Sequence, residues 1–136
     1  MSSASSEKLF AETPFGITIS ADEIVETLGF FDDGEERYRY IIDLGKQLPA
    51  FPAEMQTADR IVHGCQSQVW LEIDYDASTG QVRLAVDSDA LIVRGLAAMV
   101  LAALNRKTPA EIAHYDMEGY FASVDLVKHL SPTRGN

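Results

Sequence analysis

The stretch "VWLEIDYDASTGQVRLAVD", residues 69–87, decides the fold because apolar and polar side chains alternate along it in two successive runs. Alternation with a period of two is typical of a strand that is buried on one face. The segment "ASTG", residues 77–80, separates the two runs and is typical of a turn. We therefore expect an antiparallel hairpin, with a third edge strand from the residues just before Cys65. The face expected to be buried carries Val69, Leu71, Ile73, Tyr75, Val82, Leu84 and Val86.

An apolar helix is expected directly after the hairpin. The stretch "SDALIVRGLAAMVLAALNRK", residues 88–107, is apolar almost all round a helix and should form the central helix of the core. Ser88 is suited to cap its first turn, and Arg106 and Lys107 suit the negative end of a helix. The hairpin and this helix together predict an α/β (α+β) chain, in which a small antiparallel sheet packs on helices.

Capping residues place three further helices. Each combines a side chain that can accept a hydrogen bond from the first turn with a helical pattern after it. The first twenty residues show no helical spacing, so we expect residues 1–20 to be a partly irregular extension of a single domain, residues 21–136. The caps are Ser20 with Glu23 for a helix through about Phe30, Asp33 for a helix that ends near Lys46, and Thr108 with Glu111 for a short helix with Pro109 at its first position.

The charge and hydropathy of the chain limit its partners. Its 21 acidic and 11 basic residues give a formal net charge of −10 at pH 7. This charge repels phosphate backbones, and no cluster of lysine and arginine offsets it, so we expect no nucleic-acid partner. The longest apolar run, Ala90 to Leu104, is interrupted by Arg94 and is shorter than the roughly 20 residues that span a bilayer. We expect no membrane association.

Cys65 is the only cysteine among the 136 residues. A single thiol forms no internal disulfide, and the chain starts without a recognisable secretory leader, so we expect a cytoplasmic protein. The three histidines are scattered, and the sequence contains neither a glycine-rich phosphate loop nor a Gly-x-Ser-x-Gly elbow. We therefore expect no metal site, and the usual enzyme signatures are missing.

The stretch "HGCQSQ", residues 63–68, surrounds this thiol with polar groups and is expected to be a loop. Positive charge and hydrogen-bond donors favour a thiolate, and a glycine permits an unusual turn beside it. A small cysteine that fills the core is the alternative, and local composition alone does not decide between the two. The residues suited to support a reactive Cys65 are Arg60, His63, Gly64, Gln66, Ser67 and Gln68.

Four stretches of the chain together resemble the SufE family of sulfur-acceptor proteins. They occur in the order and spacing of that family, and the resemblance covers roughly Ile24 to Asn136. Its most specific part is Gly-Cys-Gln-Ser-Gln-Val-Trp around Cys65. The four stretches are "RYRYIIDLGKQLP", "IVHGCQSQVWL", "DSDALIVRGL" and "LSPTRGN".

The resemblance implies a SufE/IscU-like fold with the active cysteine on a loop. It also implies that Cys65 takes sulfur as a persulfide from a SufS-type cysteine desulfurase, stimulates that enzyme, and passes the sulfur to a SufB-type scaffold for iron–sulfur cluster assembly. Such a protein is a sulfur-transfer accessory protein rather than a stand-alone enzyme. It needs no cofactor, because pyridoxal phosphate belongs to the desulfurase. The candidates for docking these partners are Arg60, Asp87, Asp89 and Arg94, the last three of which also suit helix caps and surface charge.

The chain departs from the family pattern at both ends. Family members usually continue past the Ser-Pro-x-Arg motif into a last helix, whereas this sequence ends at Asn136. We expect that helix to be lacking, and we expect apolar residues of the N-terminal extension to cover the surface that it would occupy. The alternative is that the sequence is a fragment whose boundary precedes the helix. These residues are Leu9, Phe10, Phe15, Ile17 and Ile19.

Two other functions stay open at this stage. The first is a non-catalytic adaptor that activates a desulfurase by docking alone, and such an adaptor would tolerate the substitution Cys65→Ser. The second, less favoured, is an independent cysteine-dependent enzyme, although neither a fixed base nor a second cysteine supports it. A monomer and a homodimer are both compatible with the sequence.

Overall fold

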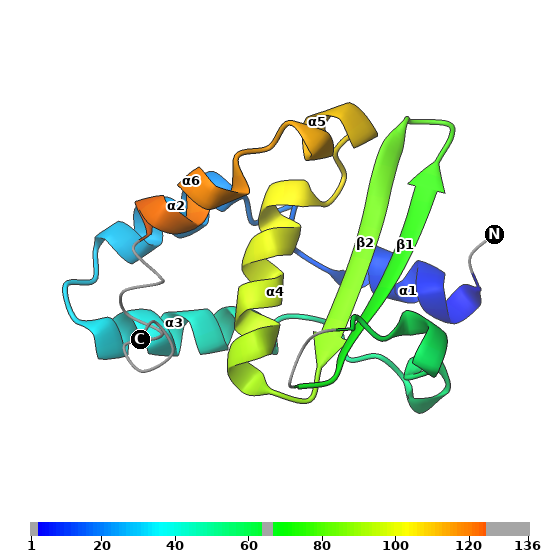
Figure 1. Cartoon of the computed structure of the whole chain (residues 1–136), viewed down its shortest axis with the longest axis horizontal. Helices are drawn as coiled ribbons and strands as arrows, with labels where there is room; N and C mark the ends of the chain where they lie inside the picture. Colours follow the sequence, from blue (N-terminus) through cyan, green and yellow to red (C-terminus); the bar gives the residue numbers. More distant parts are fainter. Residues whose placement is uncertain (1–2, 64–66, 125–136) are drawn as a thin grey trace.

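The computed structural model of the chain describes residues 3–63 and 67–124. Within these residues, helices surround one hairpin, which confirms the α+β class (Figure 1). The helices are α1 (Ala4–Glu12), α2 (Ala21–Gly29), α3 (Gly34–Lys46), α4 (Leu91–Leu104), α5 (Pro109–Ala113) and α6 (Met117–Ser123). Two 3-10 turns, η1 (Ala53–Met55) and η2 (Ala58–Arg60), precede the strands β1 (Val69–Asp76) and β2 (Gln81–Ser88).

The expected hairpin is confirmed. β1 and β2 pair in antiparallel fashion along their whole length, beginning with Val69 opposite Ser88. The third strand expected before Cys65 is reduced to a single antiparallel bridge between Ile61 and Trp70. The residues preceding that bridge form η2, so they cannot also extend along β1.

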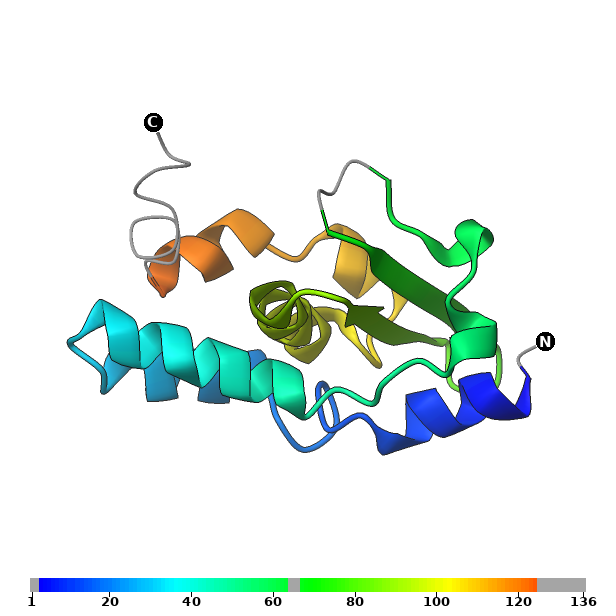
Figure 2. The same ribbon diagram turned by 90° about the horizontal axis from the view of Figure 1, so that it is seen from below.

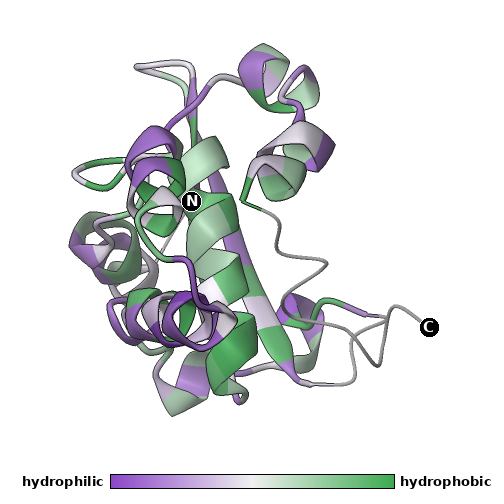
Figure 3. Cartoon of the chain, turned by 90° about the vertical axis from the view of Figure 1, so that its left-hand side faces the viewer, coloured by the Kyte–Doolittle hydropathy of each residue, from purple (hydrophilic) through white to green (hydrophobic). Residues whose placement is uncertain are grey.

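One face of the hairpin packs against α4, and α3 packs against α4 from another side (Figure 2). Figure 3 shows that α4 is apolar along most of its length. Ala98 and Met99 in this helix are fully buried, as are Ile24 of α2 and Ile41 of α3. The central position expected for this apolar helix is therefore confirmed, and its burial on several sides accounts for the near absence of a polar face.

The opposite face of the hairpin is also buried at one end. Trp70, which the alternating pattern puts on the polar face, is 6% exposed and packs with Leu9 and Phe10 of α1. A helix on each face explains why the pattern is mixed rather than strictly alternating at this end of the hairpin. Phe51, Met55 and Ala85 complete this second cluster.

The expectation of an irregular N-terminal extension is wrong over Ala4–Glu12, which form α1. The side chain of Ser3 caps this helix by accepting a hydrogen bond from the backbone N–H of Ser6, at 3.1 Å. Ser6, Leu9 and Phe10 are the buried residues of the helix, at the spacing of one helical face. The hydropathy pattern alone does not predict this helical face, because its first buried residue is a serine.

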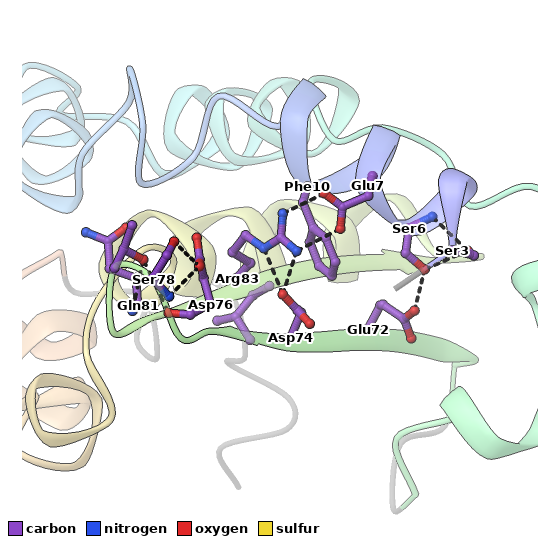
Figure 4. A network of polar contacts seen from close by, with 12 residues as sticks. Ser3, Ser6, Glu7, Phe10, Glu72, Asp74, Asp76, Ser78, Gln81 and Arg83 are labelled. Atoms are coloured by element: carbon purple, nitrogen blue, oxygen red, sulfur yellow. Dashed lines mark hydrogen bonds and ion pairs between the residues drawn. The ribbon is translucent and has the colours of Figure 1, made fainter. Parts of the chain in front are cut away.

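Arg83 of β2 holds α1 on the hairpin (Figure 4). Its guanidinium donates hydrogen bonds to both carboxylate oxygens of Glu7, at 2.9 and 2.7 Å, and to Asp74, at 3.0 Å. The same group lies 4.7 Å from the centre of the Phe10 ring. Hydrogen bonds to Glu7 and then Asp74 raise the pKa of Arg83, so the guanidinium keeps its positive charge.

The helix starts are confirmed with one exception. Ser88 does not cap α4, whose N-cap is Ala90. Ser88 ends β2, and its hydroxyl donates to the backbone carbonyl of Gln68 instead. At the other end of α4, Arg106 lies beyond the last turn with a φ of +66°. The confirmed caps are the capping boxes of Ser20 with Glu23 and Thr108 with Glu111, and the cap of α3 by Asp33.

Candidate functional site

Gly64, Cys65 and Gln66 lie outside the described residues, so the expected loop position of Cys65 stays a prediction. The residues on either side of these three, up to His63 and from Ser67, are described. The backbone N–H of Val62 donates to the carbonyl of Val69, at 2.8 Å, next to the bridge between Ile61 and Trp70. This hydrogen bond brings residues 62 and 69 together, three positions before and four positions after Cys65.

The backbone of Gln68 is hydrogen-bonded to Ser88, the last residue of β2, and to Asp89, which follows it. Its backbone N–H donates to the Asp89 carboxylate at 3.1 Å, and its carbonyl accepts from the backbone N–H of Asp89 at 3.3 Å. The same carbonyl accepts a shorter hydrogen bond, 2.7 Å, from the hydroxyl of Ser88. The backbone of Gln68 is therefore held beside the start of α4, whereas its side chain is exposed.

Asp87 and Arg94 form an ion pair inside the protein. Asp87 is 5% exposed, and its Oδ1 lies 3.1 Å from Nε of Arg94. The carboxylate also accepts the backbone N–H groups of Phe51 and Ser88, both at 2.8 Å. Arg94 donates in turn to the carbonyl of Leu48, at 2.9 Å. Through these hydrogen bonds, the ion pair links the end of β2 to the residues that follow α3.

Arg60, expected to support the thiolate, is paired with a carboxylate of β1. Its Nε lies 3.0 Å from Oε1 of Glu72, and its Nη1 donates to the hydroxyl of Thr57 at 2.8 Å. Glu72 also accepts a hydrogen bond from the hydroxyl of Ser6 in α1. The positive charge of Arg60 is therefore largely compensated, so it contributes little field at neighbouring groups. His63 is exposed and Ser67 is half-buried.

An apolar groove of about 480 Å³ lies between the hairpin and α4. Its lining includes Val62 and Val69, the hydrogen-bonded pair on either side of residues 64–66. Ile73 contributes a side chain that is 61% exposed. The other lining residues are Leu71, Val82, Leu84, Val86, Ala97, Val100, Leu101, Leu104 and Ile112. Residues on both sides of positions 64–66 therefore line an apolar surface.

Sequence reasoning missed the two residues that connect the expected site to the rest of the fold, Ser88 and Glu72. Ser88 was expected to cap a helix, and Glu72 was expected only on the polar face of a strand. The sequence contains one signal for the role of Ser88, which is its position between Asp87 and Asp89. Three successive side chains of this kind offer several hydrogen-bond acceptors to nearby backbone groups. Among residues 3–63 and 67–124, no three His, Cys, Asp or Glu side chains are grouped to hold a metal ion. No helix in this part of the chain is long and apolar enough to cross a membrane.

Comparison with known proteins gives one consistent result. Residues 22–136 match the family model described as SufE, an Fe–S metabolism associated domain. An uncharacterized SufE-like protein of Rhizobium meliloti is 43% identical over 119 residues, which cover 86% of this chain and 85% of the relative. An uncharacterized SufE-like protein of Rhizobium etli is 44% identical over 119 residues, covering 86% of this chain and 80% of the relative. α1 precedes the matched residues.

Proposed function

Because the chain belongs to the SufE family, a group associated with Fe–S metabolism, we propose that it accepts sulfur on Cys65 and passes it on for iron–sulfur cluster assembly. The observation that carries the proposal is the anchoring of residues 62 and 68 on either side of Cys65. Val62 is bonded to Val69, and Gln68 is bonded to Ser88 and Asp89. The residues on both sides of positions 64–66 are thus held to the hairpin and to the start of α4, and a relay that delivers sulfur to a partner requires such a fixed docking region.

The proposed donor is a SufS-type cysteine desulfurase that carries a cysteine persulfide. The Cys65 thiolate attacks the terminal sulfur of that persulfide, so that a sulfur–sulfur bond forms on Cys65 while the bond on the partner breaks and its thiolate leaves. One bond replaces another of the same kind, so the exchange needs no oxidant or reductant. Pyridoxal phosphate stays with the desulfurase, and the proposed protein requires no cofactor of its own.

The proposed acceptor of the sulfur is a SufB-type scaffold. Between the two transfers, the Cys65 persulfide must be kept from free thiols, which would remove its outer sulfur. The groove supports this step, because Val62 and Val69, which flank residues 64–66 in the sequence, belong to its apolar lining. Arg60 is paired with Glu72, and its support of a Cys65 thiolate stays a prediction.

Intact-protein mass spectrometry tests the relay directly. The protein and its Cys65→Ser variant are each mixed with a SufS-type desulfurase and free cysteine, and sulfide release by the desulfurase is recorded in parallel. We expect the wild type to gain the mass of one sulfur atom, removable by a reducing thiol, and the variant to gain none. A second variant, Ser123→Ala in α6, should gain sulfur as the wild type does and controls for handling.

The same experiment separates the adaptor alternative. An adaptor would raise desulfurase turnover without gaining sulfur, and it would do so equally as wild type and as Cys65→Ser. If neither protein gains sulfur and turnover is unchanged, the chain has no sulfur-acceptor function with this desulfurase class.

A further inference from the structure

The outer edge of β1 is open over residues 71–75. The carbonyl of Val69 points away from β2, because it accepts the backbone N–H of Val62. Backbone groups alternate in direction along a strand, so the N–H and C=O groups of Leu71, Ile73 and Tyr75 also point away from β2. Within residues 3–63 and 67–124, these groups make no hydrogen bond. Such an edge is a template on which another strand can pair.

The outer edge of β2, in contrast, is occupied by the residues that follow α4. The backbone N–H of Val82 donates to the carbonyl of Lys107 at 2.8 Å, and the carbonyl of Val82 accepts the N–H of Arg106 at 2.9 Å. The N–H of Leu84 donates to the side chain of Asn105 at 2.8 Å. The fold therefore closes one edge of the hairpin and leaves the other free to take a third strand.

The apolar groove lies along this open edge. Leu71 and Ile73 belong to its lining, and the side chains of Ile73 and Tyr75 are 61% and 58% exposed. Val62 and Val69 line the other end of the groove, where the edge is already paired. Because side chains alternate along a strand, a strand added to β1 would direct every second side chain toward the groove. Apolar side chains suit those positions.

Charge decides what the remaining side chains of an added strand should be. Glu72, Asp74 and Asp76 lie in a row along β1 (Figure 4). Glu72 and Asp74 each pair with an arginine, whereas Asp76 accepts hydrogen bonds from Ser78. Antiparallel pairing of β1 with a second copy around Ile73 would set Glu72 opposite Asp74, and like charges in opposite positions are destabilising. The net charge of −10 likewise favours a basic strand.

We propose that the open edge of β1 binds an extended segment of a partner protein as an antiparallel strand, with apolar side chains over the groove and lysine or arginine between them. Partner residues opposite Leu71, Ile73 and Tyr75 each exchange two backbone hydrogen bonds with β1. These bonds supply affinity, and the groove and the carboxylates supply specificity. The inference is independent of sulfur transfer, since it uses none of residues 64–66.

A synthetic peptide tests the backbone pairing. The probe is the fluorescein-labelled heptapeptide Lys-Val-Lys-Ile-Lys-Val-Lys, and its binding to the full chain is followed by fluorescence anisotropy. In the proposed pairing, the N–H of the central isoleucine points toward β1, whereas that of the lysine before it points to solvent. N-methylation of this isoleucine should therefore weaken binding roughly tenfold, and N-methylation of that lysine should weaken it much less. Equal effects of the two modifications, or no binding of the probe, would overturn the inference.

Two variants of the protein test the place of binding. Ile73→Lys adds a positive charge at the open edge, and Ile17→Lys is the matched control, because Ile17 is 51% exposed in the connection between α1 and α2. We expect Ile73→Lys to weaken binding of the probe about tenfold or more and Ile17→Lys to change it less than about twofold. Equal affinities of the two variants would overturn the inference. Sedimentation covers the second copy: a dimer of the wild type and of Ile17→Lys that Ile73→Lys abolishes would assign this edge to self-association and overturn the proposed partner.

Discussion

Gly45 of α3 and Gly95 of α4 face each other where the two helices cross, and a Cβ added to Gly45 would lie 2.5 Å from the backbone nitrogen of Gly95. A Cβ on Gly95 would overlap the carbonyl oxygen of Ile41. The helices are thus in backbone contact at this point. Glycine costs up to about 1 kcal/mol in a helix interior, and the close approach that it permits offsets this cost. The approach also sets Arg94, the residue before Gly95, beside Leu48 and Asp87.

Replacement of Gly95 by alanine should lower the free energy of unfolding by about 1–3 kcal/mol, because the added methyl group forces α3 and α4 apart. Gly29 is the matched control, since a Cβ there would meet nothing within 4 Å. Gly29→Ala should leave stability unchanged or raise it by up to about 1 kcal/mol. Urea unfolding of both variants measures the difference, and equal midpoints would show that the helices do not depend on this contact.

Phe10 should be essential for attachment of α1 to the hairpin. It is 1% exposed and packs beside Trp70, whereas Phe30 is 76% exposed. We expect Phe10→Ala to cost about 3–5 kcal/mol, as is usual for a buried phenylalanine, and Phe30→Ala to cost little. Urea unfolding gives both values, and Trp70 fluorescence should shift to longer wavelength only in Phe10→Ala. Similar unfolding midpoints for the two variants would argue against a structural role for α1.

Asn105 should contribute strongly to stability although it is polar. It is 1% exposed, its Oδ1 accepts the backbone N–H of Leu84 at 2.8 Å, and its Nδ2 donates to the carbonyl of Phe15 at 2.9 Å. Asn105→Ala leaves both backbone groups without this partner, at about 1–3 kcal/mol each. Thermal unfolding should show a clear loss, and hydrogen exchange at the Leu84 amide should become faster. Unchanged exchange at Leu84 would contradict this assignment.

Tyr120 should make the fold sensitive to alkaline pH. Burial raises the pKa of its hydroxyl above the ordinary value of 10.0, and the hydroxyl donates to the carbonyl of Met99 at 3.0 Å. The unfolded chain loses this proton near pH 10 while the folded protein keeps it, so the contribution to stability is full below that pH and falls as the pH rises further.

Urea unfolding between pH 7 and pH 11 measures this effect. Tyr120→Phe should cost about 1 kcal/mol at neutral pH through the lost hydrogen bond, and it should flatten the decline above pH 10. Tyr40 and Tyr115, whose pKa values are raised mainly by burial, keep some of the decline in the variant. An identical slope in Tyr120→Phe and the wild type would show that this hydroxyl does not govern the alkaline response.

Sequence patterns located the secondary structure well wherever the cause is local. The capping boxes of Ser20 and Thr108 involve side chains three residues apart, and both form as expected. The hairpin follows from alternation within residues 69–87, and β1 and β2 pair in antiparallel fashion over this stretch. The match of residues 22–136 to the SufE family likewise agrees with the resemblance carried by the motif around Cys65.

Patterns failed where a distant partner decides the outcome. The buried face of α1 begins with Ser6, whose hydroxyl donates to Glu72 in β1, a partner 66 positions away in the sequence. Ser88 has the side chain of a helix cap, but the carbonyl of Gln68 competes for its hydroxyl. Asp87 and Arg94 resemble surface charges in the sequence, and their partners Phe51 and Leu48 come from another part of the chain.

The amino-acid sequence alone was sufficient for the hairpin, the central apolar helix and the family, whereas the choice of Cys65 as the reactive thiol stays a prediction. These rest on periodicity and on a contiguous motif, both of which act over a few residues. The second core cluster, the backbone contact of Gly45 with Gly95, and the anchoring of Gln68 by Ser88 emerge only from the folded chain. Each joins residues far apart in the sequence, and such contacts depend on how the elements pack rather than on any local preference.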